Sequence, residues 1–271
     1  MNLAINYSPA VCKLVRTEGI QVDYFKTPDW DWMINEATQI RPIAVHFTLD
    51  AGNNQLSQVD WGHIRGLLHS TGTPFINLHL DPRQSSYPDL SVDSNNPYVV
   101  ERLYQIMYTD VKAVVQRFGA ERVIVENSPY RGETGKTMRA CVEPEIITRI
   151  VQETGVGFLL DLSHAIISAR YLDIEPSKYI ESLPVHRIKE MHFAGIHRSN
   201  GYWTDHLSIL KADWQWLDWA IECIGLGQWS SPWLLAFEYG GVGKPFKHRT
   251  NPNVMAKQVP QLYERVKLIV H

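Results

Sequence analysis

Short apolar runs alternate along the chain with longer segments in which apolar residues recur every three or four positions. The short runs have the length and β-branched content of strands that are buried on both faces. We expect strands at residues 3–7, 20–25, 43–49, 74–80, 122–127, 157–162, 187–194 and 233–239. The segments between them have the periodicity of amphipathic helices. Strand and helix alternating eight times predict a parallel sheet covered by helices.

Two of the helical segments carry clear start and stop signals. The first is expected to follow Asn96, a favourable N-cap, to have Pro97 in its first turn and to end at Gly119. Pro144 and Gly155 bracket a second helix in the same way.

Eight strands are the number that closes a (β/α)8 TIM barrel, with a doubly wound open sheet as the alternative. Barrels of about 250 residues fold as one domain, so we expect residues 1–271 to form a single TIM-barrel domain. Strand-to-helix loops are long at 81–96, 128–143 and 195–212. In a barrel, loops of this kind build the active site.

Bulk composition narrows the range of partners. A net charge of −3 and a pI near 6.4 make nucleic acid an unlikely partner, and no apolar segment is long enough for a membrane helix. The cysteines, Cys12, Cys141 and Cys223, are widely spaced and odd in number, which argues against a disulfide framework. We therefore expect a cytoplasmic protein whose substrate is not a nucleic acid.

Metal-competent side chains lie near the carboxyl ends of six successive predicted strands. They are His46, His79, Glu126, Asp161, His192 and Glu238. His164 lies in the first turn after Asp161, and the loop after the seventh strand adds Asp205 and His206. In a parallel barrel all these strand ends meet at one rim. Taken alone, an acid in the position of Asp161 is more often the cap of the following helix than a metal ligand.

Such a cluster requires cations, because several carboxylates in a half-buried site would repel one another and become protonated. Imidazole and carboxylate without thiolate suit Fe²⁺, Zn²⁺ or Mn²⁺ better than Mg²⁺, Ca²⁺ or an iron–sulfur cluster. The number of ligands implies two or three ions. Beside them, Asn127 and His197 are candidates for orienting the ligands, and Tyr130 and Arg131 for contacting substrate or ligands.

The order His, His, Glu, Asp-x-x-His, His, Asp, Glu resembles that of the xylose-isomerase-like TIM barrels, which include three-zinc apurinic endonucleases. Within that superfamily, VIVENSPY, LLDLSHAIISARYLDIEPSKYIESLP and KEMHFAGIH are most similar to the multinuclear non-haem iron oxidases typified by the methanobactin-biosynthesis enzyme. This resemblance implies a barrel that uses two or three irons and O2 to remodel a cysteine-containing peptide, often beside a partner protein that delivers it.

Two positions depart from the family's pattern. The family pattern has Asp-x-His where this chain has the adjacent residues Asp205 and His206, which leaves open whether both side chains bind metal and whether a third ion is held. His164 replaces the Asn that many of the oxidases carry.

The leading hypothesis is therefore an iron-dependent oxidase with Glu126, Asp161 and Glu238 in catalytic roles. A sugar isomerase or epimerase, or a phosphodiester hydrolase, would use the same ligands. An abasic-site endonuclease is disfavoured by the acidic charge balance. A metal-bearing scaffold without catalytic activity is the third alternative.

Overall fold

The computed structural model describes residues 1–17, 19–199 and 201–268. Contacts within the chain divide it into two compact units that are interleaved in sequence. The first unit comprises Met1–His46, Gly62–Thr73 and Glu190–His271, and the second comprises Phe47–Trp61 and Pro74–Lys189. The expected single domain over residues 1–271 stays a prediction.

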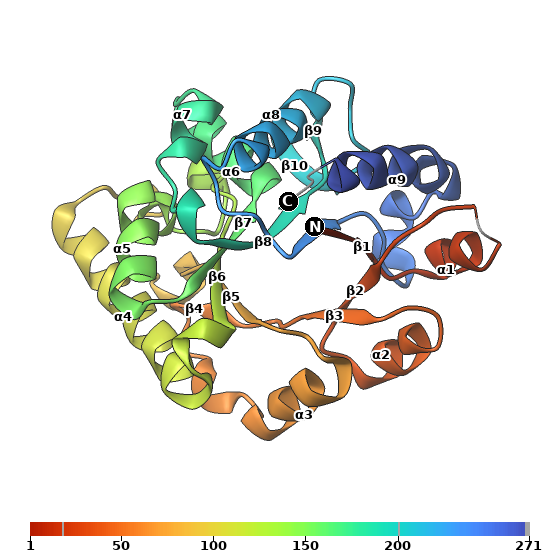
Figure 1. Cartoon of the computed structure of the whole chain (residues 1–271). Coiled ribbons are helices and arrows are strands. Elements are labelled where there is room, and N and C mark those ends of the chain that lie inside the picture. The colour runs from red at the N-terminus through yellow and green to blue at the C-terminus, as the bar shows by residue number, and fades with distance from the viewer. Residues whose placement is uncertain (18, 200, 269–271) are drawn as a thin grey trace. The chain divides into compact units, whose positions relative to one another are not determined.

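Parallel strands of the first unit lie in the order β3-β2-β1-β11-β8 (Figure 1). They are β1 (Asn2–Asn6), β2 (Tyr24–Pro28), β3 (Ile43–His46), β8 (Ile188–Phe193, which enters this unit at Glu190) and β11 (Leu234–Phe237). The helices are α1 (Pro9–Arg16), α2 (Asp31–Thr38), α3 (Trp61–Thr71), α8 (Trp214–Gly225), α9 (Pro252–Lys267) and the 3-10 helix η7 (Lys244–Arg249). An antiparallel pair is formed by β9 (Gly195–Ser199) and β10 (Tyr202–Leu207).

Parallel strands of the second unit lie in the order β7-β6-β5-β4. They are β4 (Asp50–Ala51), β5 (Ile76–Leu80), β6 (Val123–Asn127) and β7 (Gly157–Asp161). The α-helices are α4 (Pro97–Phe118), α5 (Pro144–Thr154), α6 (Leu162–Tyr171) and α7 (Pro176–Glu181). Short 3-10 helices are η1 (Leu56–Gln58), η2 (Gln84–Ser86), η3 (Ala120–Arg122), η4 (Gly132–Thr134), η5 (Arg139–Val142) and η6 (Val185–Arg187).

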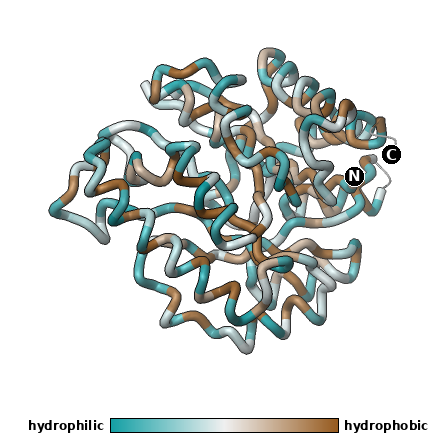
Figure 2. The backbone as a smooth tube through the Cα atoms, turned by 60° about the vertical axis from the view of Figure 1, so that its left-hand side comes forward, coloured by the Kyte–Doolittle hydropathy of each residue, from teal (hydrophilic) through white to brown (hydrophobic). Residues whose placement is uncertain are grey.

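Local signals fix the ends of α4 and α5 as predicted. The Asn96 side chain accepts a hydrogen bond from the Tyr98 amide at 2.9 Å, and Gly119 ends α4 with φ +86°. Gly155 ends α5 in the left-handed conformation that glycine adopts without strain. The buried residues of α4 recur every three or four positions, at Leu103, Tyr104, Met107, Val111 and Val114. Brown and teal accordingly alternate along the helical coils in Figure 2.

The predicted strand at 20–25 is wrong in position, because β2 runs over Tyr24–Pro28. Ile20 and Val22 are buried, at 5% and 3% exposure, although they precede the strand. Asp23 marks the transition, since its amide donates to the Leu3 carbonyl and its carboxylate accepts from the Leu3 amide. The apolar pattern at 20–25 therefore reports burial rather than strand pairing.

The long strand-to-helix loops are ordered by contacts of their own. The loops at 81–96 and 128–143 are tied together by an isolated bridge between Arg83 and Thr137 and by backbone hydrogen bonds on either side of it. The loop at 195–212 contains the β9–β10 pair. Among the helices of the described residues, none is long and apolar enough to cross a membrane.

Candidate metal centre

The candidate ligands lie at strand ends as expected, and they fall into two sets. The first unit carries His46 at the end of β3, His192 in β8, Asp205 and His206 in β10, and Glu238 just after β11; we call this the first-unit cluster. The second unit carries His79 in β5, Glu126 in β6, Asp161 at the end of β7 and His164 in α6; we call this the second-unit cluster. That both sets meet at one rim stays a prediction.

Two buried carboxylates form the centre of the second-unit cluster. Glu126 and Asp161 are each 1% exposed, and one ligand atom from each lies within 4.8 Å of the other and of a His164 ring nitrogen. His79 Nε2 lies 3.2 Å from Glu126 Oε2, and His164 Nε2 lies 3.5 Å from Asp161 Oδ2. Strand pairing brings this about, since His79 and Glu126 are direct neighbours in the β5–β6 register.

Asp161 serves two purposes with its two oxygens. Its Oδ1 accepts the His164 amide at 2.7 Å and so caps α6, as one sequence interpretation proposed. Its Oδ2 faces the His164 ring. The Asn127 side chain holds the Asp161 backbone from both sides, with its amide donating to the carbonyl and its oxygen accepting from the amide, each at 2.9 Å. The cap interpretation is confirmed, and the cap uses only one of the two oxygens.

The hydrogen bonds of His164 select its tautomer. Its Nδ1 lies 2.9 Å from the Asn127 carbonyl oxygen, which can only accept, so Nδ1 carries the proton in this contact. The lone pair is then on Nε2, the atom that faces Asp161. An imidazole anchored to a backbone carbonyl in this way is the usual arrangement of a metal-binding histidine.

His79 is surrounded by negative charge. Burial disfavours its protonated form, but the carboxylates of Glu126 and Asp50 outweigh burial and raise the pKa of His79 to about 9. Asp50 Oδ1 lies 3.5 Å from His79 Nδ1. Without a metal, His79 is therefore a cation at neutral pH that partly compensates the acids beside it.

The first-unit cluster is organised differently, around one carboxylate between two imidazoles. Glu238 Oε1 lies 3.1 Å from His192 Nδ1, and Glu238 Oε2 lies 3.2 Å from His206 Nδ1. The rings of His46 and His192 have centroids 5.4 Å apart. Burial raises the pKa of Glu238, but the imidazoles of His192 and His206 outweigh it and hold the pKa well below its usual value.

A buried ion pair, which the sequence analysis missed, anchors His192. Lys26 Nζ pairs with Glu190 Oε1, and the same oxygen lies 2.8 Å from His192 Nε2. Trp233 Nε1 donates to the other Glu190 oxygen at 3.3 Å. Burial opposes ionisation of Glu190, but Lys26 and His192 outweigh it and lower its pKa to about 2. The signal in the sequence was a lysine inside the apolar run YFKTP.

A β-bulge resolves the adjacency of Asp205 and His206. His197 on β9 pairs with Thr204 on β10, and Gly195 pairs with Leu207. Two residue positions on β9 are therefore matched by three on β10. His206 occupies the extra position with φ +57°, in the left-handed region. The bulge lets the side chains of Asp205 and His206 lie on the same face of β10. His206 Nε2 lies 3.7 Å from Asp205 Oδ1, and His206 Nδ1 faces Glu238. The sequence left open whether both side chains point the same way, and the bulge is the reason that both can.

The remaining predicted residues lie in varied surroundings. Tyr130 is 1% exposed and donates its hydroxyl to Asp93, so it joins two loops. His197 Nε2 lies 2.7 Å from the Ser208 carbonyl oxygen, which places this ring within the β9–β10 region. Arg131 lines a cavity described next.

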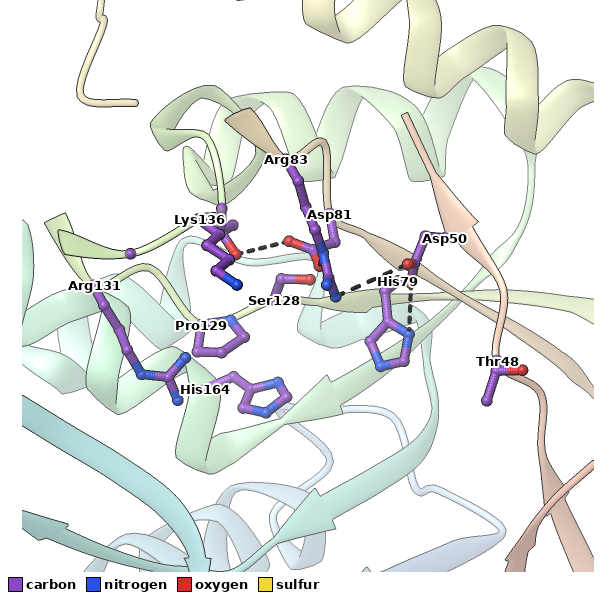
Figure 3. Close-up of a pocket in the computed structure, with 12 residues that line it drawn as sticks. Thr48, Asp50, His79, Asp81, Arg83, Ser128, Pro129, Arg131, Lys136 and His164 are labelled. Atoms are coloured by element: carbon purple, nitrogen blue, oxygen red, sulfur yellow. Dashed lines mark hydrogen bonds and ion pairs between the residues drawn. The ribbon is translucent and has the colours of Figure 1, made fainter. Parts of the chain in front are cut away.

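A cavity of about 580 Å³ adjoins the second-unit cluster. His79 and His164 line it together with Thr48 and Asp50, and the loops at 81–96 and 128–143 supply the rest of the wall (Figure 3). Asp81, buried at 6% exposure, holds these loops together by accepting from Arg83 Nε and Thr137 Oγ1, each at 2.7 Å. A ligand in this cavity would border the candidate metal ligands.

The donor chemistry of both clusters fits divalent transition metals. Each combines imidazole nitrogens with carboxylate oxygens, and none of the potential metal-binding groups found among the described residues includes a cysteine. Ions of the Fe²⁺, Zn²⁺ or Mn²⁺ type accept this mixture. Glu126, Asp161 and His164 would hold one ion, with Asn127 keeping the ligands in place.

A model of the family described as "RiPP precursor modification enzyme MbnB/TglH/ChrH" matches residues 25–228, well over half of the sequence. The chain belongs to this family. The family resemblance drawn from the sequence motifs is thereby confirmed.

Curated relatives match parts of the chain. A UPF0276 protein of Acaryochloris marina (strain MBIC 11017) is 29% identical over 109 residues, which are 40% of this chain and 35% of the relative. A UPF0276 protein of Caulobacter vibrioides (strain NA1000 / CB15N) is 33% identical over 78 residues, which are 27% of this chain and 26% of the relative. The chain thus spans about a third or less of the length of these relatives.

Solved structures show the fold. A D-tagatose 3-epimerase-like protein has a TM-score of 0.59 and 14% identity, covering 99% of this chain and 98% of that one. The IolI protein with a zinc atom has a TM-score of 0.60 and 14% identity, covering 100% and 99%. Mannonate dehydratase from Streptococcus suis serotype 2 has a TM-score of 0.61 and 10% identity, covering 99% and 95%. The fold is the xylose-isomerase-like TIM barrel, which confirms the predicted fold class.

Proposed function

We propose that this protein is an iron-dependent oxidase that uses O2 to modify a cysteine-containing peptide. The observation that carries the proposal is the family match over residues 25–228, whose description names enzymes that modify RiPP precursors, that is, peptides. The two clusters supply nitrogen and oxygen ligands of the type that non-haem iron accepts. Two or three ions remain the expected number, and a partner protein that delivers the peptide is part of the proposal.

Bound iron would supply the redox chemistry with O2, and the chain's own residues would prepare its site. Asn127 fixes the Asp161 backbone and the His164 tautomer, so that Asp161 Oδ2 and His164 Nε2 present lone pairs in the same region. On the other cluster, Glu190 orients the His192 ring through Nε2, with Nδ1 toward Glu238. Both devices preorganise donor atoms before a metal binds.

The test is anaerobic reconstitution with Fe²⁺ followed by exposure to O2 in the presence of cysteine-containing peptides. We expect O2 uptake that depends on the thiol, together with a mass change in the peptide. Asp161→Asn should abolish uptake and lower iron content, whereas Lys178→Gln, a surface change on α7 in the same unit, should alter neither. Full iron loading without O2 uptake for any cysteine peptide, including peptides presented with a partner protein, would refute the oxidase function.

A sugar epimerase is the second candidate, because the structural neighbours include a D-tagatose 3-epimerase-like protein. Polarisation of a sugar carbonyl by the same ions would need no oxidant. The Zn²⁺ or Mn²⁺ form should then turn over ketoses under strictly anaerobic conditions. Turnover without O2 would favour this candidate over the oxidase.

A further inference from the structure

The cavity beside the second-unit cluster has a wall of basic side chains that the metal ligands do not require. Arg83, Arg131 and Lys136 line it together with two acids, Asp50 and Asp81. Both acids already have cationic neighbours. Arg83 Nε donates to Asp81 at 2.7 Å, and Asp50 lies 3.5 Å from His79 Nδ1 and 3.9 Å from an Arg83 nitrogen. Arg131 and Lys136 add two further cations to this wall, in a chain whose net charge is −3.

A tight turn brings Arg131 and Lys136 to the same wall although five positions separate them. Gly132 has φ +64°, and the Gly135 amide donates to the Gly132 carbonyl at 2.9 Å. A Cβ on Gly135 would lie 3.2 Å from the Arg131 Cβ, so the turn closes tightly over Arg131. In Figure 3 the guanidinium of Arg131 points toward the His164 ring, and the Lys136 ammonium lies on the Ser128 side of the cavity.

The backbone of this wall is fixed before any ligand binds. The Lys136 carbonyl accepts the Gln84 amide at 2.9 Å, and Thr137 forms the bridge to Arg83. The Met138 amide donates to the Pro82 carbonyl at 2.9 Å, and buried Asp81 accepts from Thr137 Oγ1. A preorganised backbone reduces the entropy lost when a ligand is held. The wall is therefore a built feature that presents two cations at a cavity shared with His79 and His164.

We infer that the cavity binds a carboxylate of the peptide substrate at Arg131 and Lys136, while the substrate's reacting group lies against the second-unit cluster. This inference rests on the proposed peptide-modifying function. The carboxylate is either the peptide's C-terminus or an acidic side chain close to the modified residue. A guanidinium binds a carboxylate through paired hydrogen bonds, and the ammonium adds a point charge. The subsite thus selects peptides by charge and sets which residue reaches the metal ligands.

The test uses peptides without a thiol, so that binding is independent of iron and O2. The probes are acetyl-Ala-Ala-Ser with a free carboxylate, the same peptide as its amide, and acetyl-Asp-Ala-Ser amide. Isothermal titration calorimetry of the full-length protein as purified should show that a carboxylate peptide binds about tenfold or more tightly than the neutral amide. A gain of this size in affinity corresponds to one charge-assisted hydrogen bond. The tighter of the two carboxylate peptides identifies the source of the carboxylate.

Variants of the two basic residues test whether the peptide's carboxylate binds at this wall. Lys136→Gln and Arg131→Gln should each lower the affinity for the carboxylate peptide about tenfold, because each removes one cation of the wall. The affinity for the neutral amide should not change. Lys178→Gln removes the same charge from the surface of the same unit and should change nothing. The preference should also weaken with added salt.

Three results would overturn the inference. These are equal affinity for the carboxylate and amide peptides, an equal effect of Lys178→Gln and Lys136→Gln, and displacement of the peptide by inorganic phosphate at lower concentration than by acetate. Thiol-dependent O2 uptake without carboxylate preference would refute the subsite alone. A carboxylate preference that Lys136→Gln removes, in a protein without O2 uptake, would support the subsite and refute only the oxidase function.

Discussion

The two ligand clusters balance their charges in different ways. In the first unit, Glu238 lies between two imidazoles, and Glu190 is compensated by the buried Lys26. In the second unit, Glu126, Asp161 and Asp50 surround His79 and His164, with no lysine among these contacts. The first-unit cluster is thus compensated by the protein itself. The second-unit cluster relies on a protonated His79, and it has more to gain from a bound cation.

This difference separates two roles of buried charge. An ion pair that protein groups complete, such as Lys26 with Glu190, fixes the orientation of a neighbouring imidazole in the presence or absence of metal. Acids whose main neighbours are imidazoles gain more when a metal ion binds, which couples metal binding to stability. The experiments below separate these roles.

The largest effect is expected from breaking the buried pair of the first unit. Lys26→Met removes the ammonium partner of the buried Glu190. It should therefore lower the free energy of unfolding, measured by urea denaturation, by about 3 kcal/mol. Lys26→Met combined with Glu190→Leu should recover most of this loss, because an apolar pair of similar volume needs no desolvation of charge. Lys178→Met, at an exposed site, is the control. A loss of under about 0.5 kcal/mol for Lys26→Met would contradict the anchoring role.

The second-unit cluster should instead show its effect through metal. Saturating metal at about 100 times its Kd should raise the free energy of unfolding by about 2.7 kcal/mol, and a chelator should remove this gain. Asp161→Asn should abolish the gain yet keep the metal-free stability, because asparagine still caps α6.

Asp161→Ala is the matched comparison for this prediction. It should lose both the metal-dependent gain and the cap, and so be less stable than Asp161→Asn by about 1 kcal/mol without metal. If Asp161→Asn retains the full metal-dependent gain, Asp161 is a cap only.

In the metal-free protein, the stabilising charge of Glu190 in the first unit should be lost in acid. The stabilising charge of His79 in the second unit should be lost in alkali. Glu190 has a pKa lowered to about 2, so its contribution is present above its ordinary pKa and is lost as the pH falls through about 2. His79 has a pKa raised to about 9, so its contribution is complete below its ordinary pKa and is lost as the pH rises through about 9.

The measurement compares wild type with Glu190→Gln and His79→Gln across pH. The Glu190→Gln difference, about 2 kcal/mol at neutral pH for a charged hydrogen bond, should shrink in acid. The His79→Gln difference should be smaller, because this side chain is 23% exposed, and should shrink in alkali. Differences that stay constant with pH would rule out these charge assignments.

The smallest effect concerns the bulge that serves the first-unit cluster. His206→Asn should preserve stability, because asparagine tolerates the left-handed conformation found at φ +57°. His206→Val should be about 1 kcal/mol less stable than His206→Asn, since a β-branched residue is strained there. Thr204→Val, in the regular part of β10, should show no such penalty. Equal stability of the two His206 variants would show that the bulge relaxes freely.

Elements with local signals were predictable from the sequence. The ends of α4 follow from Asn96, Pro97 and Gly119, because caps act within a single turn. The second strand was placed four residues early, because Ile20 and Val22 are buried without pairing in the sheet. Hydropathy reports burial, and only pairing with neighbouring strands defines a strand.

The candidate site was predictable in its residue types but not in its contacts. The sequence placed nine metal-competent side chains near strand ends, where the structure also has them. It did not identify Lys26 and Glu190 as the anchor of His192, because Lys26 lies on another strand 164 positions away from Glu190. Nor did it predict that Asp205 and His206 serve one face, since alternation in a regular strand would separate them.

The sequence by itself determined the fold class, the family and the chemistry of the ligands, because periodicity, caps and residue types are properties of short segments. Only the tertiary structure decided which oxygen of Asp161 caps α6, which nitrogen of His192 faces Glu238, and which cations share a cavity wall. Those outcomes depend on distances between segments far apart in the chain, and these distances are set by strand register and loop packing rather than by neighbours in sequence.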